Sequence, residues 1–163
     1  MWYTEYEKYF HPWNQLSEEQ RQLFFNRAEY LPLPADHADR IRVLKGAAAR
    51  EFAKQALLDI PGYSSSISSE FRKEDSMPLS EVWNDQQKIQ QVRDWLHRRG
   101  ISYSTLVYLL YDDLVVATDW KMVVKYWDAF AWAVGVEMLA LDSTKTWVCS
   151  FHHEDVITFS SHG

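Results

Sequence analysis

The chain has 163 residues, of which 47% are hydrophobic and 25% charged, a balance typical of a folded domain rather than a disordered one. Its formal net charge of −6 argues against nucleic-acid binding, which needs a basic surface to displace counterions. No apolar run approaches the roughly 20 residues of a transmembrane helix, so no membrane association is expected. The single cysteine, Cys149, excludes an internal disulfide and, with no signal-like N-terminus, favours a cytoplasmic protein. Because Cys149 shares strand parity with Trp147 and Phe151, it is expected to be a buried, inert thiol on an apolar strand face.

Aromatic residues are concentrated at the N-terminus. They form two series at helical spacing, which predict a short helix or irregular arm that ends near Pro12. Core packing of this arm is the favoured interpretation, because monomers seldom expose large apolar patches. A surface partner site is the alternative. The six residues are Trp2, Tyr3, Tyr6, Tyr9, Phe10 and Trp13.

Helices are predicted to follow this arm. Ser17 and Gln20 match a capping box, which opens a helix to about residue 30. Asp36 is then predicted to cap a longer helix that ends near Leu58, because apolar residues recur on one face. Residues 61–80 contain seven serines and are expected to form a loop. The apolar face of the longer helix consists of Ile41, Leu44, Ala48, Phe52 and Ala56.

The second half is predicted to contain the sheet. A third helix runs between Ser80 and Gly100 and precedes a hairpin of strands 105–110 and 114–117. Asp119 is predicted to cap the cleanest amphipathic helix of the chain, which carries Trp120 and Trp127 on its apolar face. A second hairpin joins 136–141 to 146–151 through a turn at Asp142, and 156–159 forms an edge strand.

These elements predict one α+β domain over residues 1–163. A helical part spans about 1–60, the Ser-rich loop spans 61–80, and a helix and sheet part spans 81–160. The architecture is therefore N-terminal helices followed by a mainly antiparallel sheet with one intervening amphipathic helix.

Charge distribution leads to the favoured functional hypothesis. Residues 103–163 hold eight acids against three lysines, a net charge of −5. We expect an acidic protein-interaction module that binds a basic protein partner. In composition and architecture the chain resembles bacterial immunity and inhibitor proteins, a resemblance that rests on no motif and implies no site residue. The predicted partner-binding residues are Asp112, Asp113, Asp142 and Glu154.

Two alternatives remain open. The ligand run His152, His153 and Glu154 suggests a metal-dependent enzyme, although strand alternation places at most two such residues on one side. Trp120 and Trp127 suggest instead a pocket for a sugar or flat metabolite. The sequence contains no catalytic motif or glycine-rich nucleotide fingerprint, so no catalytic residue or cofactor is assigned and a non-enzymatic role is favoured.

Overall fold

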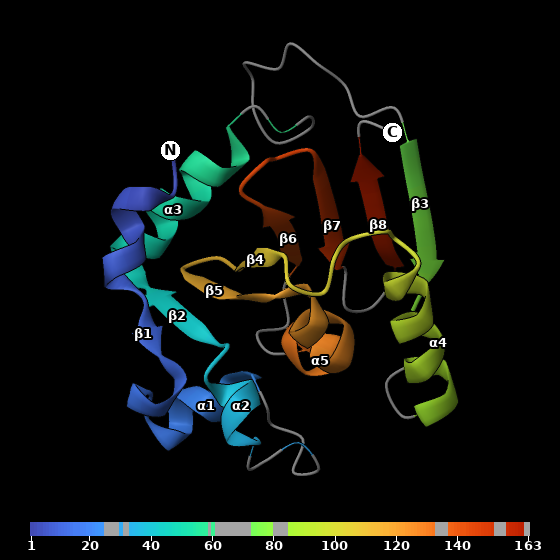
Figure 1. The fold of residues 1–163 in the computed structure, drawn as a ribbon, viewed down its shortest axis with the longest axis horizontal. Helices are drawn as coiled ribbons and strands as arrows, with labels where there is room; N and C mark the ends of the chain where they lie inside the picture. Colours follow the sequence, from blue (N-terminus) through green and yellow to red (C-terminus); the bar gives the residue numbers. More distant parts are fainter. Residues whose placement is uncertain are drawn as a thin grey trace.

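The computed structural model describes residues 1–24, 30, 33–58, 60, 73–79, 85–132, 137–151 and 156–161. The strands of these residues form one antiparallel sheet in the order β1-β2-β5-β4-β6-β7-β8-β3, so the predicted α+β fold is confirmed (Figure 1). The strands are β1 (His11–Pro12), β2 (Arg42–Lys45), β3 (Lys73–Pro78), β4 (Leu106–Leu110), β5 (Leu114–Asp119), β6 (Met138–Asp142), β7 (Trp147–Phe151) and β8 (Val156–Ser161). The helices are η1 (Thr4–Tyr9), η2 (Trp13–Gln15), α1 (Glu18–Phe24), α2 (Ala35–Ala38), α3 (Gly46–Leu57), α4 (Gln86–His97) and α5 (Trp120–Trp132).

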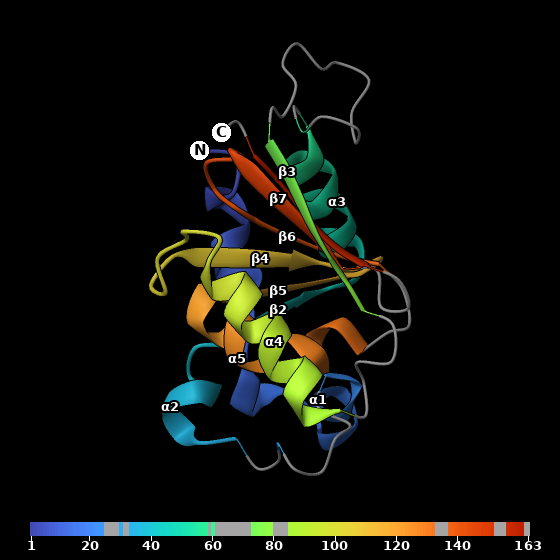
Figure 2. The same cartoon turned by 90° about the vertical axis from the view of Figure 1, so that its right-hand side faces the viewer.

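Helices cover both faces of the sheet, which explains why the central strands are apolar on both sides. Side chains alternate along β4, so Val107 and Leu109 join the core under α4 and α5. Tyr108 and Leu110 join the core under α3 and η1. Figure 2 shows the sheet between α4 and α5 on one side and α3 on the other. None of the helices in the described ranges is long and apolar enough to cross a membrane.

The N-terminal arm packs on the body, as predicted for its core interpretation. Tyr6, Phe10 and Trp13 are at most 8% exposed, and the rings of Tyr6 and Phe10 lie 5.3 and 5.7 Å from the ring of Phe52. Tyr9 is the exception, because its side chain remains 53% exposed. Of the short helix or irregular arm that was predicted, the structure forms two short 3-10 helices, and Pro12 pairs with β2 in the sheet.

The long helix predicted from Asp36 to Leu58 is wrong. The chain forms the short helix α2, then β2, and only then α3, which begins at Gly46 with a φ of +69°. Ile41 and Leu44 fit a helical face by spacing, but in the structure Ile41 and Val43 join one core cluster and Leu44 joins the other, as in a strand covered on both faces. Pairing of β2 with β5, from Arg42 opposite Ala117 to Lys45 opposite Leu114, decides between the two.

Three further features of the fold differ from the sequence predictions: one additional strand, the position of β8 in the sheet, and the first residue of α4. Strand β3 forms within the segment expected to be a loop and pairs with β8 along its whole length. Strand β8 is therefore flanked by β7 and β3 and is not an edge strand. Helix α4 begins at Gln86 with Asp85 as its N-cap, since the Asp85 carboxylate accepts hydrogen bonds from the backbone N–H groups of Gln87 and Lys88. Ser80 and residues 61–72 lie outside the described residues.

Local hydrogen-bond signals were more reliable. Ser17 and Gln20 form the reciprocal bonds of the capping box, at 3.0 and 3.2 Å. Asp119 Oδ1 accepts from the Met122 N–H at 2.9 Å and caps α5, as predicted. Both predicted hairpins, β4–β5 and β6–β7, are confirmed by their register.

Candidate functional site

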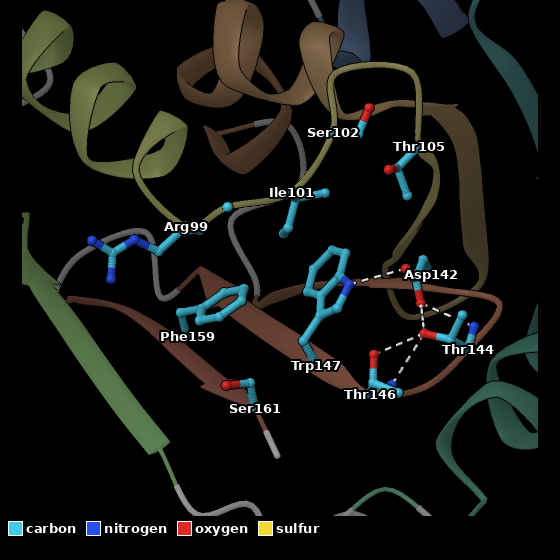
Figure 3. Close-up of a pocket in the computed structure, with 11 residues that line it drawn as sticks. Arg99, Ile101, Ser102, Thr105, Asp142, Thr144, Thr146, Trp147, Phe159 and Ser161 are labelled. Carbon is cyan, nitrogen blue, oxygen red and sulfur yellow. Dashed lines mark hydrogen bonds between the residues drawn. The ribbon is translucent and has the colours of Figure 1, made fainter. Parts of the chain in front are cut away.

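A cavity of about 580 Å³ lies at one end of the sheet (Figure 3). It is bounded by the turn between β6 and β7, the end of β8 and the loop that connects α4 to β4. Gly100, with a φ of +81°, lets the chain leave α4 and turn into that loop. Residues that are distant in sequence therefore meet around one space.

The floor of the cavity is aromatic. Trp147 and Phe159 project from the same face of the adjacent strands β7 and β8, and their rings stack with centroids 5.6 Å apart and an interplanar angle of 23°. Behind them, the ring of Trp120 contacts Trp147 edge-on at 5.5 Å. Because Trp120 is fully buried, the floor is anchored directly to the core.

Asp142 holds the indole of Trp147 in place. Its Oδ2 accepts a hydrogen bond from Trp147 Nε1 at 3.0 Å. Its Oδ1 accepts from Thr144 N at 2.9 Å and from Thr144 Oγ1 at 2.5 Å. Only 9% of Asp142 is exposed, so this carboxylate fixes both the β6–β7 turn and the orientation of the floor.

The β6–β7 turn also contacts the C-terminal end of α3. Lys145 adopts a φ of +57°, and its Nζ donates to the carbonyl oxygens of Gln55 and Leu58 at 2.6 and 3.0 Å. A cation at this position complements the carbonyl end of the α3 dipole. Trp2 Nε1 also donates to the Ser143 carbonyl at 3.1 Å, so the turn is held from several sides.

Arg99 lines the cavity, but its charge is directed elsewhere. Its Nη1 lies 2.7 Å from Asp75 Oδ2 on β3, and its Nε donates to the Trp95 carbonyl at 2.9 Å. The guanidinium also lies 4.1 Å from the centroid of the Trp95 ring. Figure 3 shows the side chain pointing away from Trp147 toward β3. Arg99 therefore fastens β3 to the end of α4.

Hydroxyl groups surround the aromatic floor. Thr144 and Thr146 contribute from the β6–β7 turn, and their Oγ1 atoms lie 2.8 Å apart. Ser102 and Thr105 contribute from the loop before β4, and Ser161 contributes from the end of β8. The lining thus combines an apolar base with polar groups that can donate or accept hydrogen bonds.

The acidic residues predicted to form one binding surface are separated in the structure. Asp142 lies opposite Val107 at the start of β4, whereas Asp112 and Asp113 are exposed in the turn beyond its other end. The strand rise places these two sites about 16 Å apart along β4. Glu154 lies outside the described residues.

The metal-ligand run also falls outside them. His152, His153 and Glu154 are not among the residues that the structure describes. Within the described ranges, no group of three or more His, Cys, Asp or Glu side chains is arranged to hold a metal ion. Cys149 is fully buried, and burial raises the pKa of its thiol. This agrees with the inert, packed cysteine expected from its strand parity.

Trp120 and Trp127, the residues predicted to wall a ligand pocket, are fully buried core residues. Trp127 Nε1 donates to the Ile89 carbonyl at 3.3 Å. Neither side chain lines the cavity above Trp147 and Phe159, although Trp120 supports its floor. Sequence reasoning missed Trp147 and Phe159 as site residues. The sequence placed Trp147 on the same strand face as Cys149 and Phe151. It could not show that this face meets Phe159, because that contact depends on the pairing of β7 with β8.

A second polar cluster fastens the helices to one another. Asp128 on α5 is fully buried and accepts a hydrogen bond from the Tyr30 hydroxyl at 2.6 Å. Arg93 on α4 donates to the Tyr30 hydroxyl at 3.1 Å and lies 4.0 Å from Asp128. Nearby, α5 is kinked at Tyr126, whose hydroxyl lies 2.7 Å from His37 Nδ1. Asp128 therefore links α5 to α4 through Tyr30 and Arg93, and the separate contact between Tyr126 and His37 links α5 to α2.

Comparisons of the chain with protein-family models, with curated proteins and with solved structures found no match. The candidate site is therefore interpreted from its own geometry and chemistry. That geometry contains an aromatic floor, a fixed carboxylate and a ring of hydroxyls, which together are suited to binding a small molecule.

Proposed function

We propose that the protein binds a small molecule in the cavity above Trp147 and Phe159. The observation that carries this proposal is the combination of volume and lining. A space of about 580 Å³ falls within the range of ligand pockets, roughly 300–1,000 Å³. Its apolar floor and convergent polar groups supply the burial and the orientation that such a site needs.

The rigidity of the floor supports the proposal further. Trp147 is held by Asp142 on one side and by Trp120 on the other. A ligand that contacts Trp147 therefore meets a side chain that is already ordered. The protein loses less side-chain conformational entropy on binding than it would at a mobile site. The proposed site would thus be carried by strands of the sheet, and the loop after α4 would form one wall.

The test is a thermal-shift screen of a broad metabolite collection against a pair of matched variants. Ser102→Trp introduces a large side chain at the cavity wall. Ser104→Trp introduces the same side chain two residues away, at an exposed position outside the lining. Both variants lose the Ser102–Ser104 hydroxyl contact of 3.1 Å, so they differ mainly in what they do to the cavity.

We expect at least one metabolite to raise the melting temperature of the wild type and of Ser104→Trp, but not of Ser102→Trp. If no metabolite stabilises the wild type, the proposal is wrong. Equal stabilisation of both variants would place the binding site elsewhere and would also reject it.

A second proposal is the acidic, immunity- or inhibitor-like interaction module, and it is favoured by the exposure of Asp112 and Asp113. These adjacent acids lie together in the β4–β5 turn and are both open to solvent. Charge complementarity would then draw a basic protein to this end of the molecule. The surface is smaller than the charge of the sequence suggested, because Asp128 and Asp142 are buried.

The test compares reversal of two adjacent acid pairs. Asp112→Lys with Asp113→Lys is the active change, and Glu18→Lys with Glu19→Lys on α1 is the matched control, since all four are exposed. We expect salt-sensitive capture of a basic protein to be lost only with the first pair. Equal capture by both variants would contradict a role for the β4–β5 turn.

A further inference from the structure

The cavity contains formal charges, but each is already engaged by the protein. Asp75 neutralises Arg99 at 2.7 Å, and the guanidinium points toward β3. The Asp142 carboxylate receives its hydrogen bonds from neutral donors on Thr144 and Trp147. An anionic ligand would approach this carboxylate while the nearest lining cation is directed away. The electrostatics therefore disfavour phosphorylated or carboxylated ligands.

The remaining polar groups of the lining are hydroxyls. Ser102 and Thr105 approach from the loop before β4, Thr144 and Thr146 lie in the β6–β7 turn, and Ser161 lies at the end of β8 opposite Trp147. A hydroxyl can both donate and accept a hydrogen bond, and its rotor adjusts to its partner. Such groups match a ligand whose own polar atoms are hydroxyls and alternate between the two roles.

Asp142 retains capacity for one more hydrogen bond. A carboxylate offers about four acceptor positions, and the structure shows three donors on Asp142. A ligand hydroxyl that donates to the remaining position would make a charge-assisted bond. That bond requires a donor on the ligand, which excludes a purely apolar ring as the best occupant.

The floor favours a ligand with an apolar face. Trp147 and Phe159 line the base of the cavity with ring centroids 5.6 Å apart and with 6% and 8% of each residue exposed, and the ring of a sugar carries C–H groups on one face and hydroxyls around its edge. We propose that the ligand of this cavity is a neutral saccharide of about one ring, with its C–H face on Trp147 and Phe159 and its hydroxyls on the surrounding Ser, Thr and Asp142 side chains. This inference rests on the proposed function and assigns the ligand class of the same site.

The experiment follows the indole N–H signal of Trp147 by NMR in the full chain, identified by its loss in Trp147→Phe. The neutral probes are glucose, galactose, mannose and N-acetylglucosamine. Glucose 6-phosphate is the anionic probe, glucosamine the cationic probe and cyclohexanol the apolar ring. We expect at least one neutral sugar to shift this signal, with an affinity at least about tenfold higher than those of the other three probes.

Hydroxyl deletions provide the second readout. We expect Thr146→Val and Thr105→Val each to weaken binding of that sugar about 3- to 10-fold, the loss of one hydrogen bond. Thr158→Val is the matched control, since Thr158 lies on β8 next to Phe159 but outside the lining. Its affinity should remain within about twofold of the wild type.

Failure of this inference can be separated from failure of the proposed function. If the neutral sugars leave the Trp147 signal unchanged at up to about 50 mM, the saccharide assignment is overturned. It is also overturned if the charged or apolar probes bind more tightly, or if both deletions leave the affinity intact. The metabolite screen with Ser102→Trp and Ser104→Trp judges separately whether the cavity binds any small molecule.

Discussion

Asp142 and Trp147 should be energetically coupled, and a double-mutant cycle can measure that coupling. The bond from Trp147 Nε1 to Asp142 Oδ2 is 3.0 Å long, and both residues are at most 9% exposed. Asp142→Ala removes the acceptor and leaves the indole N–H without its bond. Trp147→Phe removes the donor and keeps an aromatic ring on the floor. The double variant removes both partners.

The magnitude follows from the environment of each bond. An orphaned buried donor costs about 1–3 kcal/mol, and a bond to a charged group contributes about 1.5–3 kcal/mol. Thr144 is exposed, so water can take the place of the Asp142 carboxylate at its N–H and hydroxyl groups. The Thr144 bonds are lost equally in Asp142→Ala and in the double variant, so their contribution cancels in the cycle. The cycle therefore isolates the bond to the indole. We expect the double variant to be about 2 kcal/mol more stable than the sum of the single losses predicts.

The assay is urea denaturation of the four proteins at one pH, followed by Trp fluorescence and by circular dichroism. The two signals check that each variant unfolds in two states, which the cycle requires. A coupling energy below about 0.5 kcal/mol would refute the reasoning, because contacts that matter usually exceed that value. It would mean that Asp142 does not hold the floor of the cavity.

Three other results are expected. Asp128→Ala should lower the free energy of unfolding by about 2–4 kcal/mol in urea titrations, because it leaves the Tyr30 hydroxyl and a nearby arginine without a buried carboxylate. Burial raises the pKa of the Cys149 thiol, so its contribution to stability is complete below the unfolded pKa of about 8.5 and is lost as the pH rises above it. Cys149→Ala should therefore flatten the decline in unfolding free energy above about pH 8.5. The metal hypothesis predicts that zinc or manganese raises the melting temperature of the wild type, and that His152→Ala and His153→Ala abolish this shift.

Each of these results has its own counter-outcome. Asp94→Ala, at an exposed carboxylate on α4, should change stability by less than about 0.5 kcal/mol, and an equal loss in both Asp variants would contradict the role of Asp128. A pH profile that is the same with and without Cys149 would show that the thiol is not buried in solution. A wild type that responds to neither metal would reject the metal site.

The sequence by itself determined the local features of this protein. The capping box at Ser17, the cap at Asp119 and the two hairpins depend on contacts between residues a few positions apart. Such signals can be read in any window of the chain, because the partner lies within it. The burial of Cys149 also followed from the alternation of its own strand. Together they were sufficient for the α+β class.

Only the tertiary structure decided the strands β2 and β3. Ile41 and Leu44 fit a helical face by spacing, but pairing of β2 with β5 selected the strand. The sequence of β3 is mostly polar, so it carries no hydrophobic alternation, and it becomes a strand because β8 offers it backbone partners. A strand at the end of the sheet order is expected to be polar, since charges there oppose pairing with other chains.

The cavity was decided in the same way. Trp147 was visible in the sequence as one residue of a buried strand face, but Phe159 joins it only because β8 pairs with β7. The loop after α4 and the turn at Asp142 are more than 35 residues apart, and strand pairing of β4 with β6 brings them together. Periodicity and capping report contacts within a segment, whereas a site of this kind depends on which segments become neighbours.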